Sequence, residues 1–306
     1  MSPDLLDILF KFDFWGSLLL GYPLNIILII LIIFKTPKEM ETHSRILIQN
    51  CVLDILGLIN QMLAQIFCII DGNGNSAFIF TNGILFEFIK NNFNKIICQS
   101  FIVIGQFFFI INLYGLCAQF VYRYLILNRN MKPKFRRYLY MFLVVLLVGL
   151  IYNLIIILFA TFDGGIKMFD EVNRTLPFII KKAMLNWPAF IVTLIILLPY
   201  FIIFICGFKM VYYVNLHTGF DQNMKRLLKQ LTKTLIILAI IPFINQFLTL
   251  LTIFFTFNNN ENIKNIIYIF LVILNHFTPV FNPIVCIITN KPYKEAVCNR
   301  LRIHPQ

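Results

Sequence analysis

Seven long stretches of the chain are apolar and almost free of charge, and no other feature limits the possible folds as strongly. Asp54 is the only Asp, Glu, Lys or Arg residue within them, and they cover residues 14–34, 46–70, 96–121, 138–162, 183–208, 234–257 and 265–290. Crossing the hydrocarbon core of a bilayer takes about 20 apolar residues as a helix, which also satisfies every backbone polar group internally. We therefore predict an all-α membrane protein, with residues 1–306 forming one seven-transmembrane helix bundle.

Composition excludes the other broad classes of protein. Of the 306 residues, 59% are apolar and only 13% are charged, which is too little charge to cover a soluble domain and too much apolar surface for a disordered chain. The net charge of +12 would favour nucleic-acid binding in a soluble protein. In a membrane protein it is better explained by basic loops facing anionic lipid. We expect the lipid bilayer as a partner and no nucleic acid.

The basic residues also predict the orientation of the bundle. Of the 26 Lys and Arg residues, 18 fall on the side of the membrane that holds the C-terminus. Loops rich in Lys and Arg stay in the cytoplasm, so the N-terminus is expected outside. The sequon Asn173-Arg174-Thr175 lies in a loop placed outside, which makes Asn173 a candidate glycosylation site. After the seventh span, residues 291–298 predict a short cytoplasmic amphipathic helix, where Cys298 is either a lipidation site or a free thiol.

Polar groups within the spans are the candidates for function, because they are costly in lipid and usually face the bundle interior. Asp54 is the only carboxylate deep inside a span, and Asn25 and Asn282 lie at comparable depths in the first and seventh spans. These three groups predict either a structural set of interhelical hydrogen bonds or a conformational switch or cation site.

No catalytic or metal-binding pattern is present in the sequence. It holds no HExxH, GxSxG or P-loop motif, and its seven cysteines form no CxxC or Cys/His cluster with metal-ligand spacing. His276 is the only histidine in a span, and no carboxylate lies within a helical turn of it. We therefore expect a protein that is not an enzyme and carries no cofactor or metal.

The motifs of the third and seventh spans together resemble a known family. Cys98 at the outer end of the third span precedes Arg123 of Tyr122-Arg123-Tyr124 by 25 residues, a spacing similar to that of rhodopsin-like G-protein-coupled receptors. The chain resembles more closely the nematode chemosensory serpentine receptors of the Str superfamily, and among them class delta (Srd). The other motifs that carry this resemblance are Asn25–Leu28, Lys35–Met40, Ser44–Leu47, Ile241-Pro242, Pro279–Pro283 and Lys291–Tyr293.

The resemblance implies a chemosensory receptor that binds a small odorant or metabolite in the outer half of the bundle. It implies activation of a heterotrimeric G protein through Tyr122, Arg123 and Tyr124, although Tyr122 stands where related receptors carry an acidic residue; a membrane anchor is the other interpretation of Arg123. The expected location is the plasma membrane of a sensory cell, with the sensory cilium as one candidate. The alternative is a ligand-gated cation channel or transporter, which would need a polar path through the whole bilayer.

The candidate ligand contacts are the inward polar groups on the outer side of Asp54, namely Gln61, Gln65, Gln106, Gln246 and His276. The Phe and Ile residues around them favour a small, mostly apolar ligand. Each polar group could instead pair one helix with another.

The resemblance also implies a disulfide from Cys98 to the second extracellular loop. That loop, residues 161–182, contains no cysteine. Cys68, near the outer end of the second span, is the cysteine at a similar depth, so a Cys68–Cys98 bridge is one expectation and two free thiols the other.

Overall fold

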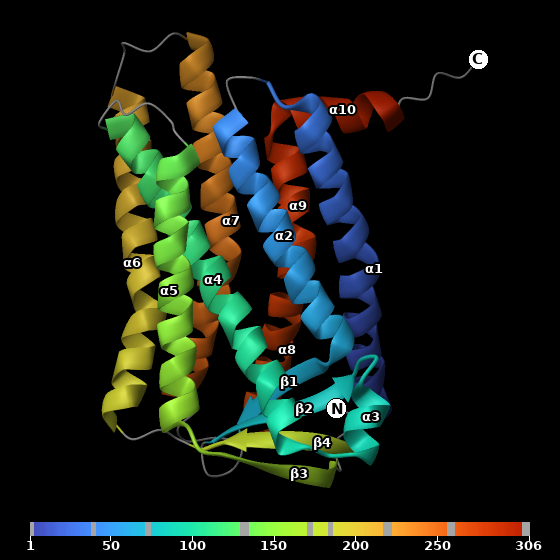
Figure 1. Cartoon of the computed structure of the whole chain (residues 1–306). Coiled ribbons are helices and arrows are strands. Elements are labelled where there is room, and N and C mark those ends of the chain that lie inside the picture. Colours follow the sequence, from blue (N-terminus) through green and yellow to red (C-terminus); the bar gives the residue numbers. More distant parts are fainter. Residues whose placement is uncertain are drawn as a thin grey trace, which may run out of the picture.

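The computed structural model describes the chain apart from residues 1–2, 38–40, 71–74, 129–134, 170–173, 183–185, 217–221, 256–260 and 302–306. Long helices packed side by side form the bundle shown in Figure 1. They are α1 (Pro3–Lys35), α2 (Glu41–Leu63), α4 (Lys95–Asn128), α5 (Phe135–Phe159), α6 (Asn186–Leu216), α7 (Gln222–Phe255), and the pair α8 (Glu261–His276) and α9 (Thr278–Thr289).

The apolar helices have the length that a membrane requires. In the described residues, α1, α2, α4, α5 and α6 each hold a segment long and apolar enough to cross a bilayer, and α8 with α9 forms a sixth, bent by 49°. The helix α7 takes the remaining place in the bundle, and Thr232–Leu248 is the apolar part of it whose side chains the structure describes. The predicted helix bundle is confirmed, and the exposed Phe and Leu side chains of α5 and α6 give it an apolar outer face suited to lipid.

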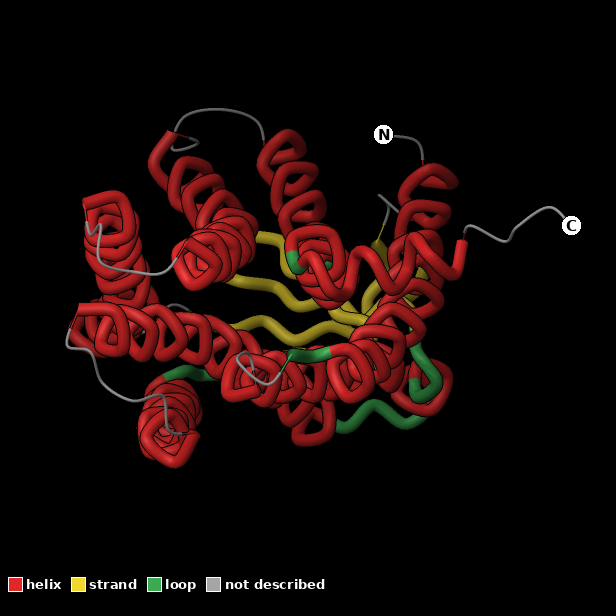
Figure 2. The backbone as a smooth tube through the Cα atoms, turned by 90° about the horizontal axis from the view of Figure 1, so that it is seen from above, coloured by secondary structure: helices red, strands yellow, loops and turns green. Residues whose placement is uncertain are grey.

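A four-stranded antiparallel sheet, which we did not predict, covers one end of the bundle (Figures 1 and 2). Its order is β1-β2-β4-β3, from β1 (Gln65–Ile70), β2 (Ser76–Asn82), β3 (Phe162–Phe169) and β4 (Arg174–Lys181). The short helix α3 (Phe86–Asn91) follows β2. Two predicted span boundaries are therefore wrong, because residues 65–70 and Phe162 belong to strands. We call this end, where α1 begins, the outer end, following the orientation predicted above.

The end of α2 explains why its span is shorter than predicted. The carbonyl groups of Met62 and Leu63 accept hydrogen bonds from the backbone N–H groups of Ile84 and Leu85, at 2.9 and 3.0 Å. These contacts satisfy carbonyls that a continuing helix would otherwise use. They require Gly83, whose φ is 126° and whose position leaves only 2.5 Å between an added Cβ and the Leu63 carbonyl oxygen.

The largest apolar cluster among the described residues lies at the opposite, inner end of the bundle. Leu28, Leu47, Phe120 and Met210 of four different helices belong to it. The short helix α10 (Lys291–Leu301) lies across this end (Figure 1), and its Tyr293 is fully buried in the cluster. The hydroxyl groups of Tyr293 and Thr36 lie 2.9 Å apart, which ties α10 to the end of α1. The predicted helix after the seventh span is therefore present.

Candidate functional site

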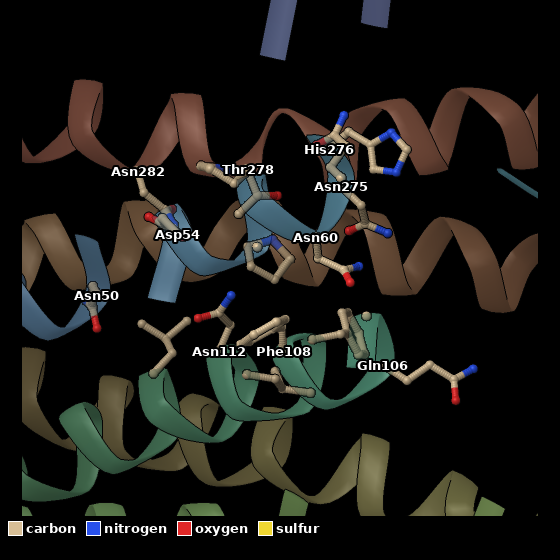
Figure 3. A pocket seen from close by; sticks show the side chains of 18 of the residues that line it. Asn50, Asp54, Asn60, Gln106, Phe108, Asn112, Asn275, His276, Thr278 and Asn282 are labelled. Atoms are coloured by element: carbon tan, nitrogen blue, oxygen red, sulfur yellow. The ribbon is translucent and has the colours of Figure 1, made fainter. Parts of the chain in front are cut away.

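A cavity of about 370 Å³ lies inside the bundle, between α2, α4, α7, α8 and α9, and the strands β1 and β2 cover its outer end. This volume is within the range of small-molecule sites in proteins. Most of its wall is apolar, but a track of amides and other polar groups runs along it (Figure 3). These are Asn50, Asp54, Asn60, Gln61, Gln106, Asn112, Gln119, Asn275, His276, Thr278 and Asn282.

Two of the three predicted switch residues meet in the cavity wall. The side-chain amide of Asn282 donates to both carboxylate oxygens of Asp54, at 3.1 and 3.0 Å, and Figure 3 shows the two side chains next to each other. Asp54 is only 2% exposed, so this contact satisfies a buried carboxylate. Asn25 instead donates to the backbone carbonyls of Gly21 and Pro279, at 2.9 and 2.8 Å. It therefore joins α1 to the same bent span without reaching Asp54.

At the outer end, His276 belongs to a buried network that sequence reasoning missed. Its Nδ1 lies 2.6 Å from Oδ2 of Asp13, a fully buried carboxylate on α1. The same carboxylate oxygen accepts a hydrogen bond of 2.7 Å from Gln65. Asp13 precedes the first predicted span by one residue, and only the longer course of α1 brings it into the bundle. The one available signal was its position just before that span.

The five candidate ligand contacts fall into two groups. Gln61, Gln106 and His276 line the cavity, whereas Gln65 and Gln246 do not. Gln65 is fully buried, and both ends of its amide make structural hydrogen bonds. The nitrogen donates to Asp13 and to the Phe10 carbonyl, and the oxygen accepts from Thr81 and Asn82. Gln61 donates to Ser17 at 2.8 Å. Gln65 therefore joins the strand β1 to α1 and to β2, and Gln61 joins α2 to α1.

The inner end of α4 shows how Arg123 is held without an acidic neighbour. One of its guanidinium NH2 groups contacts the imidazole of His43 on α2, with a distance of 3.0 Å to Nε2. Its other terminal nitrogen is buried without a hydrogen-bond partner among the described residues. Tyr122 is buried and packs edge-on against Tyr138, while Lys209 of α6 lies over the ring of Tyr124. Arg123 therefore points into the bundle, which corrects the interpretation of it as a membrane anchor.

The predicted Cys68–Cys98 bridge is absent, and both thiols are free. Cys68 lies on β1 opposite Phe78 of β2, whereas Cys98 is fully buried in the first turn of α4, in an apolar cluster to which Cys68 does not belong. The prediction placed Cys68 at the end of a helix, whereas the structure places it on a strand. Burial raises the pKa of Cys68 to about 11. Cys298 is exposed, and the sequon residue Asn173 lies outside the described residues.

Within the described part of the chain, no three His, Cys, Asp or Glu side chains gather where they could hold a metal ion. Among the amides of the cavity lining there is one carboxylate, Asp54, and one imidazole, His276. These two groups are not in contact and so do not form an acid–base pair. Its chemistry is that of hydrogen-bonding recognition inside an apolar wall.

Comparisons with known proteins agree with this architecture. The family model of the serpentine-type 7TM GPCR chemoreceptors Srd matches residues 13–299. The structure of squid rhodopsin is similar, with a TM-score of 0.67 and 16% sequence identity, covering 98% of this chain and 87% of that one. No curated protein sequence matches the chain. The rhodopsin likeness shows the fold, and the family match covers nearly the whole chain. The protein therefore belongs to the Srd family of serpentine seven-transmembrane chemoreceptors.

Proposed function

We propose that this multi-pass membrane protein binds a small molecule in the cavity and in response activates a heterotrimeric G protein at its inner end. The observation that carries the proposal is the extent of the cavity along α4. Its lining runs from Phe101 near the sheet to Gln119, one helical turn before Arg123. A ligand in the cavity thus contacts the same helix that presents the proposed coupling residues Tyr122, Arg123 and Tyr124.

The transmission step follows from the bent seventh span. Its outer part carries His276 and its inner part carries Asn282, and both residues line the cavity. A ligand that favours a different angle between α8 and α9 would shift the population toward a second arrangement of the bundle. Because Asn282 lies on α9 and Asp54 on α2, a change in this angle would move the Asn282 amide relative to the Asp54 carboxylate. The pair therefore acts as the proposed switch.

The inner end supplies the coupling element. Arg123 is held by the neutral acceptor His43, which is a weaker partner for a guanidinium than a carboxylate. A G-protein segment that offers backbone carbonyls or a carboxylate could take over this contact. We expect receptor activation to separate Arg123 from His43, so that the guanidinium becomes available to the partner.

The cation channel is the alternative, and the polar track in the cavity is the observation in its favour. The track ends, however, at the apolar cluster around Leu47, Leu116 and Phe120. The guanidinium of Arg123 lies beyond it and repels cations. The closed inner end therefore favours a receptor.

The test is expression of the receptor in cells with a G-protein reporter and a panel of volatile and small metabolic compounds. Responses should disappear when G-protein signalling is blocked. A ligand-evoked current that persists under the block would support the channel instead. We further propose that the receptor resides in the plasma membrane of a sensory cell, the sensory cilium included, with a glycan on Asn173 and a lipid on Cys298.

A further inference from the structure

We infer that the cavity selects an uncharged ligand with an apolar body and one polar group that both donates and accepts hydrogen bonds, such as an alcohol or a carboxamide. The inference refines the ligand side of the proposed function and rests on it. It is carried by the charge of the cavity wall and by three amides without partners.

The charge of the lining excludes anions. Among the described residues that line the cavity there is no Lys or Arg, Asp54 is the one carboxylate, and the one imidazole, His276, already contacts the carboxylate of Asp13. A carboxylate or phosphate ligand would lose its hydration and meet the Asp54 carboxylate without a Lys or Arg side chain to compensate. A cationic ligand would find only Asp54, which already accepts two hydrogen bonds from Asn282. The lining therefore suits a neutral molecule.

Three amides supply the polar contacts. Asn60 points from α2 and Asn112 from α4 into the same space, and Gln106 lies further along α4 (Figure 3). The Oε1 atom of Gln106 is buried without a hydrogen-bond partner, and the side chains of Asn60 and Asn112 bond no other residue in the described ranges. An unpaired buried acceptor is costly, so a ligand that donates to it gains affinity. Amides offer donors and acceptors together, which matches a ligand group of the same kind.

The remaining wall accommodates an apolar body. Phe101, Phe108 and Phe109 of α4 and Phe78 of β2 line the cavity around the amides. Two glycines leave room beside them, because nothing lies within 4 Å of a Cβ added to Gly57, and a Cβ on Gly105 would first meet Asn60, at 3.4 Å. An aromatic ring or a short alkyl chain therefore fits next to the polar group.

The experiment measures binding to the purified full-length receptor in lipid nanodiscs, without a G protein. Five probes share one apolar body and differ in the polar group: 2-phenylethanol, phenylacetamide, phenylacetate, 2-phenylethylamine and ethylbenzene. Ligand binding raises the unfolding temperature by an amount that grows with the logarithm of the ratio of free ligand concentration to Kd. We expect the alcohol and the amide to bind at least about tenfold more tightly than the acid, the amine or the hydrocarbon.

Variants test whether the amides are responsible. Gln106→Leu and Asn112→Leu should each weaken binding of phenylacetamide by about tenfold while binding of ethylbenzene is kept. Gln246→Leu is the matched control, since Gln246 lies on α7 outside the cavity lining, and it should bind as the unmodified receptor does. Asn112→Asp should transfer the preference to 2-phenylethylamine. Each variant is compared with its own ligand-free unfolding temperature, so a folding defect is visible separately.

Tighter binding of the acid or the amine by the unmodified receptor would overturn the inference, as would unchanged binding in both leucine variants. No temperature shift with either neutral probe at millimolar concentration would also overturn it. Selective binding of the neutral probes without a cellular G-protein response would leave the inference standing and reject the coupling step of the proposed function. The two failures are therefore distinguishable.

Discussion

His276 on the bent seventh span lies 2.6 Å from Asp13 on α1, through Nδ1 and Oδ2. His276 also lines the cavity, whereas Asp13 is fully buried behind it. The contact therefore holds in place the side chain that a ligand would meet at the outer end. Gln65 of β1 bonds the same carboxylate and brings the covering sheet into the network.

Breaking this contact should destabilise the receptor. Asp13→Ala removes the acceptor of both His276 and Gln65, and we expect a loss of roughly 3 kcal/mol, because buried polar groups lose their partner. Thermal unfolding in nanodiscs measures it. In a double-mutant cycle with His276→Phe, the coupling energy between the two positions should be roughly 1 kcal/mol or more. Additive effects would mean that the two side chains do not stabilise each other.

Because Asn282 satisfies the buried carboxylate of Asp54, the stability lost in a variant without Asn282 should be partly restored by removing Asp54 as well. Asn282→Leu removes both hydrogen bonds of the buried carboxylate and should cost roughly 3 kcal/mol. Asp54→Leu combined with Asn282→Leu removes the carboxylate as well, and this double variant should be more stable than Asn282→Leu alone. Unfolding temperatures of the three variants decide the matter. A double variant that is less stable than Asn282→Leu would contradict a pair that satisfies the carboxylate.

Arg123 should be needed for coupling and His43 should restrain it. Arg123→Ala is expected to reach the cell surface but to lose G-protein signalling, while Arg123→Lys, which keeps the charge without the planar fork, should signal weakly. His43→Phe removes the acceptor on α2 and should raise ligand-independent signalling. The reporter assay is read at equal surface level, measured by epitope labelling. Full signalling by Arg123→Ala would assign that residue a purely structural role.

The two outer cysteines should react as free thiols. Unreduced receptor that is unfolded in the presence of an alkylating reagent should be modified at both Cys68 and Cys98, which mass spectrometry of the peptides can detect. Burial raises the pKa of Cys68 to about 11, so its thiolate is scarce at neutral pH. Its labelling rate in the folded receptor should therefore rise about tenfold for each pH unit between neutral pH and that pKa. A peptide linked through both cysteines would refute the prediction.

Orientation remains a prediction from the Lys and Arg distribution. An epitope before Met1 should be labelled on intact cells, and one after Gln306 only after permeabilisation. Removal of N-linked glycans should lower the apparent mass of the receptor, and Asn173→Gln should abolish that shift. The reverse labelling pattern would place the sheet in the cytoplasm and would contradict the receptor orientation.

The helices were predictable because the bilayer leaves the backbone few choices. A run such as 138–159 has no charge and no neighbour that could satisfy its amides in lipid, so it must form a helix. The sheet was not predictable by the same argument. Gln65–Ile70 is as apolar as the helix before it, and a short apolar run does not distinguish strand from helix. What ends the helix is Gly83 with the chain after it, which lies 20 residues beyond Leu63 in the sequence.

Some contacts of the candidate site could likewise be predicted from the sequence, and others could not. Asp54 and Asn282 could be paired from their depth in two spans, since a buried carboxylate needs donors. The contact of Asp13 with His276 joins residues 263 positions apart and depends on how far α1 extends beyond the bilayer-length segment. The partner of Arg123 could not be predicted, because His43 lies before the predicted second span and only the tilt of α2 against α4 brings the two together.

The bend of 49° between α8 and α9 has a mechanical consequence. Phe277 sits at the junction, with His276 next to it on one arm and Asn282 more than a turn away on the other. The two helices meet at the level of the cavity, so a change in the angle between them pivots there. A ligand that displaces the His276 side chain by a fraction of an ångström would move the far end of α9, with α10 attached to it, through a larger distance. Under the proposed function, this single interrupted helix would amplify a ligand's contact into a larger movement at the inner end of the bundle.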